Sequence, residues 1–116
     1  TTELNELRLA FKHCRYALEP VADVAPKASA RLMRRLRAAQ DCIGEHRDTL
    51  LAEHWVRSNE RLLGRELSDR LVADLGSRER LLRRRAAMRC GRVLAAWRDW
   101  RSATRRLRQE RSTGRP

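Results

Sequence analysis

A row of basic side chains on one predicted helix is the part of this sequence best suited to hold a ligand. Arg8, Lys12 and Arg15 recur at spacings of four and three, so they share one face of a helix expected over residues 2–19. Neighbours at these spacings lie about 5 to 6 Å apart at Cβ. Long cationic side chains in such a row can contact successive phosphate groups. The row therefore predicts binding of a phosphorylated polyanion.

The same helix carries an apolar seam beside the basic row. Its members also recur at spacings of three and four: Leu4, Leu7, Phe11, Cys14 and Leu18. The basic row follows the seam by one residue, so the cations flank the buried surface and do not lie opposite it. Packing of the seam against partner helices would then line a groove with positive charge.

Two further basic groups could join this groove. Residues 24–40 contain no acidic residue but include Arg34 and Arg37, and the last predicted helix carries Arg85, Arg89 and Arg92 beside its apolar stripe. All three groups would converge if the first, second and last helices share one side of a bundle. A basic stripe is also typical of a solvated flank, and spacing alone leaves both interpretations open.

The sequence gives little support to catalysis or to a metal or cofactor site. His13, His46 and His54 are scattered, and no pair falls at the i, i+4 spacing of a helical zinc site. His13 and Cys14 are adjacent and point in different directions on a helix, which argues against a Cys-His nucleophile pair. No glycine-rich phosphate loop of the GxxxxGK[ST] type occurs. We therefore expect a protein that is not an enzyme, without cofactor or metal.

Two segments resemble a repeat unit of the CHAD (conserved histidine α-helical domain) family. They are residues 4–19, LNELRLAFKHCRYALE, and residues 38–48, AAQDCIGEHRD. In the first segment Asn5 stands where the family has its histidine, and the family's basic residues and tyrosine correspond to Arg8, Lys12, Arg15 and Tyr16. Its helix-to-helix junction corresponds to Gln40, Asp41, Gly44, Glu45 and Asp48. The resemblance lies in the first half of the chain.

The resemblance implies both a fold and a function. CHAD proteins are built from two related four-helix halves with a basic pocket that binds inorganic polyphosphate. This chain is accordingly expected to be an all-α, antiparallel four-helix bundle, one half of such a domain, that binds polyphosphate without chemistry. Supporting roles fall to residues that cap helices, pack or orient the cations: Asn5, Tyr16, Gln40, Asp41 and Asp48.

Composition agrees with a small helical protein. The 116 residues suffice for one domain, and Val, Ile and Thr number only eleven, which favours helices over strands. The three cysteines lie on or beside apolar helical stripes and are expected to be buried free thiols. No apolar run reaches the roughly 20 residues that span a bilayer. We expect no membrane partner and a cytoplasmic location, with polyphosphate granules as the candidate site of association.

The positions of proline and glycine predict where the helices begin and end. Pro20 should kink or end the first helix, and Pro26 should start a second helix that stops near Gly44. Asp48 could cap a third helix that stops before Gly64. A short continuation over residues 65–75 and a last helix from Ser77 complete a bundle spanning residues 1–103. Residues 104–116, rich in arginine, are predicted to be a flexible tail.

Charge leaves two alternative functions open. The formal net charge is +12, and residues 78–116 contain 14 of the 27 Lys and Arg residues but only 3 of the 15 acids. Such a polycation could bind nucleic acid without sequence specificity, although aromatic residues are few. Alternatively, the chain is a structural half-domain, which either self-associates as a homodimer or is completed by a second repeat preceding Thr1.

Overall fold

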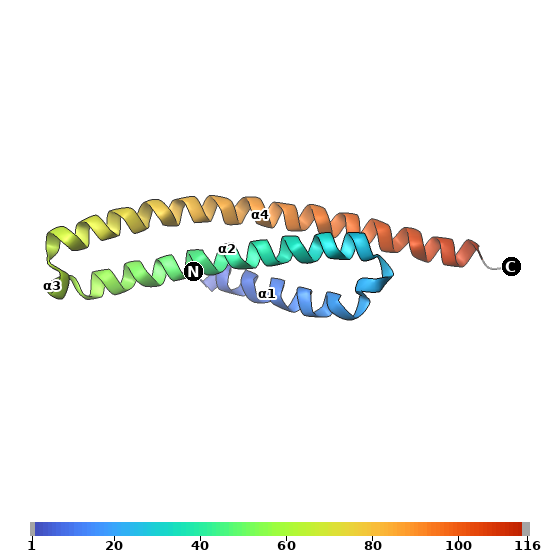
Figure 1. The fold of residues 1–116 in the computed structure, drawn as a ribbon, viewed down its shortest axis with the longest axis horizontal. Helices are drawn as coiled ribbons and strands as arrows, with labels where there is room; N and C mark the ends of the chain where they lie inside the picture. The colour runs from blue at the N-terminus through green and yellow to red at the C-terminus, as the bar shows by residue number, and fades with distance from the viewer. Residues whose placement is uncertain (1, 115–116) are drawn as a thin grey trace.

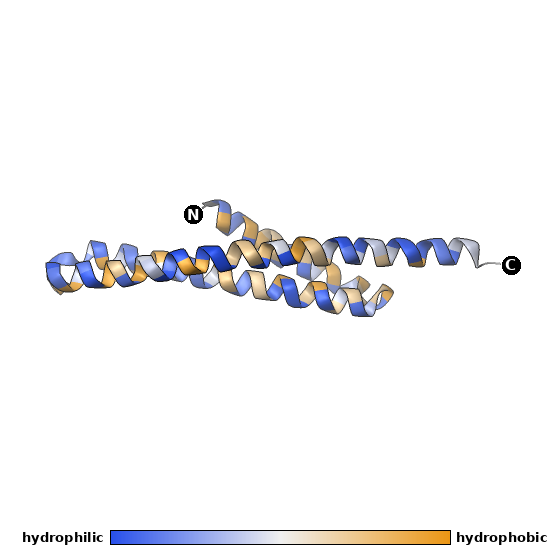
Figure 2. Cartoon of the chain, turned by 90° about the horizontal axis from the view of Figure 1, so that it is seen from above, coloured by the Kyte–Doolittle hydropathy of each residue, from blue (hydrophilic) through white to orange (hydrophobic). Residues whose placement is uncertain are grey.

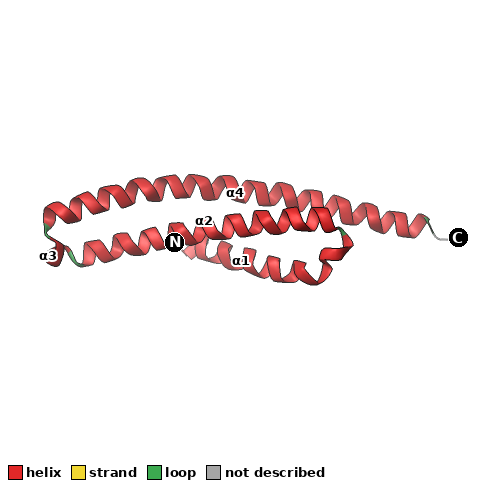
Figure 3. Cartoon of the chain, in the orientation of Figure 1, coloured by secondary structure: helices red, strands yellow, loops and turns green. Residues whose placement is uncertain are grey.

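The structure, a computed structural model, describes residues 2–114 and is helical throughout this range apart from short connections (Figure 3). The elements in chain order are α1 (Thr2–Leu18), the 3-10 helix η1 (Glu19–Val24), α2 (Pro26–Ser58), α3 (Glu60–Leu63) and α4 (Arg65–Thr113). No strand occurs between residues 2 and 114. The predicted all-α class is confirmed, as are the helix end before Pro20 and the helix start at Pro26.

The described chain is a long helical hairpin with a third helix along part of its side. α2 and α4 run antiparallel and are joined at one end by α3, while α1 lies along the first half of α2 (Figure 1). The overall extents are 78 × 20 × 18 Å. Gly64 has a φ of +85°, a conformation that glycine adopts without strain, and it forms the turn from α3 into α4.

The expected four-helix bundle is not the arrangement of residues 2–114. α2 runs through Gly44 and Asp48, and α4 runs through Gly76 and Ser77, so three long helices replace the predicted four. A glycine inside a helix costs only about 1 kcal/mol relative to alanine, and packing on both sides of it can exceed that. Buried Ile43 and His46 flank Gly44 in this way. Glycine predicted the turn correctly only at Gly64.

Residues 104–113 of the predicted flexible tail are helical and continue α4. Arg, Leu, Gln and Glu have high helix propensity, and extending an existing helix requires no new nucleation. This extension runs past the start of α2, and Figure 2 shows it in mostly hydrophilic colours. Its arginines are exposed. The extension is thus a basic helix that presents cations at fixed spacing.

The core consists of two connected apolar clusters between the three long helices. One contains Leu18 from α1 with Leu32 and Leu36 from α2 and Val93 from α4, and Cys14 packs against it. The other contains Cys42, Ile43, Leu82 and Ala86, with Leu4, Leu7 and Cys90 packed against it. Phe11 contacts both clusters. Every member of the predicted α1 seam therefore packs against the core.

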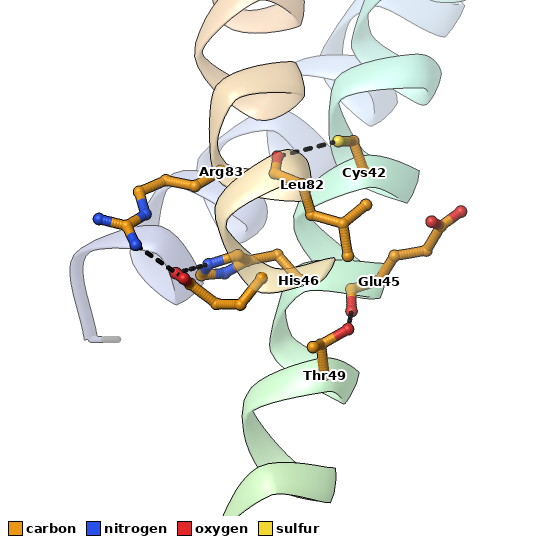
Figure 4. A network of polar contacts seen from close by, with 7 residues as sticks. Cys42, Glu45, His46, Thr49, Leu82 and Arg83 are labelled. Atoms are coloured by element: carbon orange, nitrogen blue, oxygen red, sulfur yellow. Dashed lines mark hydrogen bonds and ion pairs between the residues drawn. The ribbon is translucent and has the colours of Figure 1, made fainter. Parts of the chain in front are cut away.

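A buried polar network ties α2 to α4 next to the second cluster (Figure 4). The side chain of His46 is almost fully buried, and its Nε2 lies 2.9 Å from Oε1 of Glu79. Arg83 Nη2 donates a hydrogen bond of 2.7 Å to the other carboxylate oxygen. The hydrogen bond from Arg83, followed by the contact with His46, lowers the pKa of Glu79 below its ordinary value of 4.5. A charged Glu79 thus fixes the register of the hairpin.

The core packing predicts a large effect at Leu36, whose side chain is fully buried. Leu36→Ala leaves a cavity at the junction of α1, α2 and α4 and should lower the free energy of unfolding by about 2 to 5 kcal/mol. Urea denaturation followed by circular dichroism measures this loss. Leu62→Ala is the matched control, because Leu62 is 78% exposed and should change stability by less than about 0.5 kcal/mol. Equal effects would contradict the assigned core.

The Glu79 network predicts a pH dependence of stability. A carboxyl whose pKa is lower in the folded than in the unfolded chain stabilises the fold above about pH 4.5, and this contribution disappears as the pH falls through the folded value. Glu79→Gln should therefore be less stable than the native chain at neutral pH and lose less stability on acidification. Denaturation midpoints between about pH 7 and about pH 3 measure this. Glu110→Gln, an exposed carboxyl, should retain the native profile.

Candidate functional site

A groove between α1 and α2 gathers much of the predicted site. Arg8 and Arg15 form its α1 wall, and its volume is about 500 Å³. The α2 wall consists of Gln40, Asp41, Gly44, Glu45 and Asp48. These are the two segments that sequence comparison singled out, and the antiparallel packing of α1 on α2 brings them face to face. We call this feature the α1–α2 groove.

Helical spacing places the other cations predicted for the site on α1 and α2 next to the lining of the groove. Lys12 lies between Arg8 and Arg15 in the same helical row. On α2, Arg37 precedes Gln40 and Asp41 by three and four residues, and Arg34 precedes Arg37 by three, so both extend the groove face of α2. Cys14 packs in the cluster that contains Leu36, which places Arg15 level with this basic end of α2.

Half-burial and local contacts orient the cations of α1. Arg8 Nη2 lies 3.4 Å from Oδ1 of Asn5, to which it donates a long hydrogen bond. The guanidinium carbon of Arg15 lies 5.3 Å from the centre of the Tyr16 ring, and Lys12 Nζ lies 6.0 Å from it. Both separations are within the range of cation–π attraction. Asn5 and Tyr16 thus contact the cations that they were predicted to support.

Buried polar atoms without partners mark this groove. Nε of Arg8, Nε of Arg15 and Oε1 of Gln40 are covered by protein and have no hydrogen-bond partner among the described residues. Buried polar groups are normally paired, and leaving one unpaired costs free energy. Two of the three atoms are donors on the basic wall. All three are covered by protein, so a ligand could reach them only if these side chains moved.

The acids of the α2 wall oppose the cations at one end only. Asp41, Glu45 and Asp48 are exposed, and the one ion pair found for them among residues 2–114 joins Glu45 to Arg78 at 3.8 Å. These three acids follow one another along α2, each farther from Arg37 than the one before. Positive charge is therefore concentrated at the opposite end of the groove, around Lys12, Arg15, Arg34 and Arg37.

The predicted capping roles on α2 are wrong, because α2 is continuous. Gln40, Asp41 and Asp48 lie in the interior of α2 and cannot cap a helix end. Their side chains line the groove instead. Asp and Gly commonly mark helix ends, but here α2 continues through both.

The structure does not bring the arginines of α4 into the groove. Arg89 Nη1 donates a hydrogen bond of 3.1 Å to the carbonyl oxygen of Ala38. Ala38 precedes Gln40 by two residues, a rotation of about 200°, so Arg89 contacts the opposite side of α2 from the groove. Arg85 and Arg92 share the helix face of Arg89. The expected convergence of three basic helices is therefore wrong for this chain.

Sequence reasoning missed two features of the surface. Arg47 lines a hollow of about 330 Å³ together with Asn5, Arg8 and His46. A second cleft, between η1 and α4, contains Trp97 with Arg101, Arg105 and Arg108. Its signal was present in the sequence, because these four residues share one helix face, but Arg105 and Arg108 fall in the segment predicted to be a tail.

The remaining observations concern metal ligands, thiols and membrane spans within residues 2–114. No cluster of three or more His, Cys, Asp or Glu side chains there could hold a metal ion. Cys14, Cys42 and Cys90 are free thiols. Burial raises the pKa of Cys14 and, together with the proximity of Cys42, that of Cys90. Thiols with raised pKa are protonated and weakly nucleophilic near neutral pH. In addition, none of the described helices is long and apolar enough to span a membrane.

Comparison with known proteins yields one match. Residues 1–57 match the family model of the CHAD domain. No curated protein and no solved structure matches the chain. The matched range covers α1, η1 and nearly all of α2, so it contains both walls of the α1–α2 groove, whereas α4 lies outside it.

Proposed function

We propose that the chain, whose residues 1–57 match the CHAD family model, binds inorganic polyphosphate, or a similar phosphorylated polyanion, in the α1–α2 groove without chemical turnover. The single observation that carries this proposal is the row of Arg8, Lys12 and Arg15 along the groove. The row flanks the packed seam of α1, and its neighbours Asn5 and Tyr16 contact the cations.

The dimensions of the groove suit an extended phosphate chain. Arg8 and Arg15 are seven residues apart, which corresponds to about 10 Å along the helix axis. Arg37 and Arg34 prolong the basic surface along α2 beyond Arg15. Several phosphates of one chain could therefore be contacted at once, each by a charge-assisted hydrogen bond. A single phosphate would use only part of this surface.

Electrostatics favours the end of the groove around Lys12, Arg15, Arg34 and Arg37. The ligand would enter there, at the end away from Glu45 and Asp48, and reach Arg8 next to Asp41. Binding would release condensed counterions, so affinity should fall with increasing salt. Preorganised cations lose less conformational entropy on binding than free surface arginines, and a groove should therefore retain affinity at physiological salt.

Nucleic acid is the competing ligand, and the observation that favours it is the exposed basic extension of α4. The two functions use different residues, because the extension contributes nothing to the α1–α2 groove. Duplex DNA is accordingly included as a ligand in the experiments below.

The first prediction of this proposal concerns the basic row. The triple variant Arg8→Gln, Lys12→Gln and Arg15→Gln removes the α1 wall and should lower polyphosphate affinity about 100-fold or more, because each charge-assisted hydrogen bond is worth about 1.5 to 3 kcal/mol. Calorimetric titration at about 0.15 M salt measures this. Helicity by circular dichroism should be unchanged.

The matched control removes the same charge elsewhere. Arg61→Gln, Arg65→Gln and Arg70→Gln alter exposed arginines near the tip of the hairpin, and polyphosphate affinity should change little. Equal loss in both triple variants would show that attraction depends on net charge alone and would overturn the groove. Retained polyphosphate affinity in the basic-row variant, with loss of DNA binding when residues 104–116 are deleted, would favour nucleic acid as the ligand.

The second prediction concerns the acids of the α2 wall. Asp41→Asn with Asp48→Asn removes two negative charges from the groove and should raise polyphosphate affinity about 5-fold, the effect expected for charges about 8 Å away in a solvent-exposed setting. Glu45 is left intact because it pairs with Arg78. Glu66→Gln with Asp69→Asn, both near the hairpin tip, is the control. An equal gain in that control would contradict a ligand bound in the groove.

A further inference from the structure

A second cleft lies between η1 and α4 and shares no residue with the α1–α2 groove. It is lined by Val21 and Val24 from η1 and by Trp97, Trp100 and a row of arginines from α4, and its volume is about 420 Å³. Small-molecule sites typically enclose about 300 to 1,000 Å³ and combine an apolar lining with a few polar groups. The cleft has both properties.

One wall of the cleft is a rigid aromatic platform. The Nε1–H of Trp100 donates a hydrogen bond of 2.9 Å to Oγ of Ser29, a residue that is only 2% exposed. Trp97 stacks on Trp100 with ring centres 5.4 Å apart and an angle of 15° between the planes. Trp97 itself remains 38% exposed and lines the cleft. Its indole is thus held in place and accessible to a ligand.

The facing wall is apolar and not covered by other parts of the described chain. Val21 and Val24 are 40% and 43% exposed, high values for large apolar side chains. Together with Trp97 they make up an aromatic and aliphatic part of the lining, which we call the slot. Such a slot suits a flat, weakly polar ring, which would remove apolar surface of both walls from water.

A row of arginines that have no ion-pair partner in the described part of the chain extends from this slot along α4. Arg101, Arg105 and Arg108 recur at spacings of four and three and extend over about 10 Å of α4. Within the described part of the chain, none of the three side chains forms an ion pair or a hydrogen bond. Thr104, the other polar residue of the lining, donates its hydroxyl to carbonyl groups of its own helix. The guanidinium groups are therefore available to a ligand anion.

We propose that the cleft binds a nucleotide, with its base stacked on Trp97 between Val21 and Val24 and its phosphates along Arg101, Arg105 and Arg108. Aromatic side chains bind bases through their π faces, and guanidinium groups bind phosphate oxygens through paired hydrogen bonds. A bare phosphate chain would use only the arginines, and an uncharged ring only the slot. A long single strand would need a succession of aromatic platforms, whereas the cleft offers one.

Tryptophan fluorescence tests this proposal directly. Trp55 lies outside the cleft and is 54% exposed, so Trp55→Phe removes its emission and leaves Trp97 and Trp100 as the reporters. We expect adenosine triphosphate to quench this emission saturably at about 0.15 M salt, with at least about 10-fold higher affinity than adenosine or tripolyphosphate. Equal affinity for tripolyphosphate and adenosine triphosphate would overturn the proposal, as would binding of a single-stranded oligonucleotide alone.

Further variants, each made in the chain that carries Trp55→Phe, test separately whether the aromatic platform and the arginine row bind the ligand. Trp97→Leu retains an apolar side chain but removes the platform and should weaken adenosine triphosphate binding about 10-fold. The triple variant Arg101→Gln, Arg105→Gln and Arg108→Gln should weaken it by at least as much, while the hairpin-tip control Arg61→Gln, Arg65→Gln and Arg70→Gln should not. Unchanged affinity in Trp97→Leu, with circular dichroism showing native helicity, would overturn the proposal.

The proposal does not depend on polyphosphate binding in the α1–α2 groove. The variant Arg8→Gln, Lys12→Gln and Arg15→Gln should retain nucleotide affinity, because none of these residues lines the cleft. Loss of nucleotide binding in that variant would show that both ligands use the groove and would contradict a separate site.

Discussion

The packing of α2 against α4 is the constraint on which the rest of the structure depends. Both helices are much longer than the 20 × 18 Å cross-section of the molecule. Polar residues cover most of the surface of each helix. Their shared seam has Leu32, Leu36 and Ile43 on one side and Leu82 and Val93 on the other, and all five side chains are buried. Isolated helices of this polarity gain little from propensity alone, so tertiary burial stabilises them.

α1 depends on that seam and in turn creates the site. Its apolar residues enter the same two clusters, and this fixes its rotation about its own axis. Because the basic row follows the seam by one residue, the rotation leaves Arg8 and Arg15 half-buried at the boundary with α2. Their aliphatic stems cover apolar surface while their charged ends face the groove. Stability and the proposed ligand binding thus use opposite ends of the same side chains.

The two basic surfaces differ in what surrounds the cations. The α1–α2 groove is polar on both walls, which suits a ligand made of phosphates alone. The cleft at η1 joins a comparable row of arginines to an aromatic platform, which suits a ligand that also carries a ring. Arginine spacing is similar in both, so chemical specificity would come from the neighbouring residues and not from the charge.

Local sequence patterns were enough to predict the helical class, the apolar seam of α1, the basic row beside it and the helix boundaries at Pro20, Pro26 and Gly64. Each of these follows from local periodicity or from the restricted backbone of proline and the freedom of glycine. Only the tertiary structure decided that α2 and α4 continue through Gly44 and Gly76, that the arginines of α4 lie away from the groove, and that Trp97 faces a cleft. Whether a helix continues past a glycine, and which neighbour each helix face meets, depends on packing between segments distant in sequence. The free energy of this packing exceeds the small helix preferences of single residues, which are all that a local sequence pattern contains.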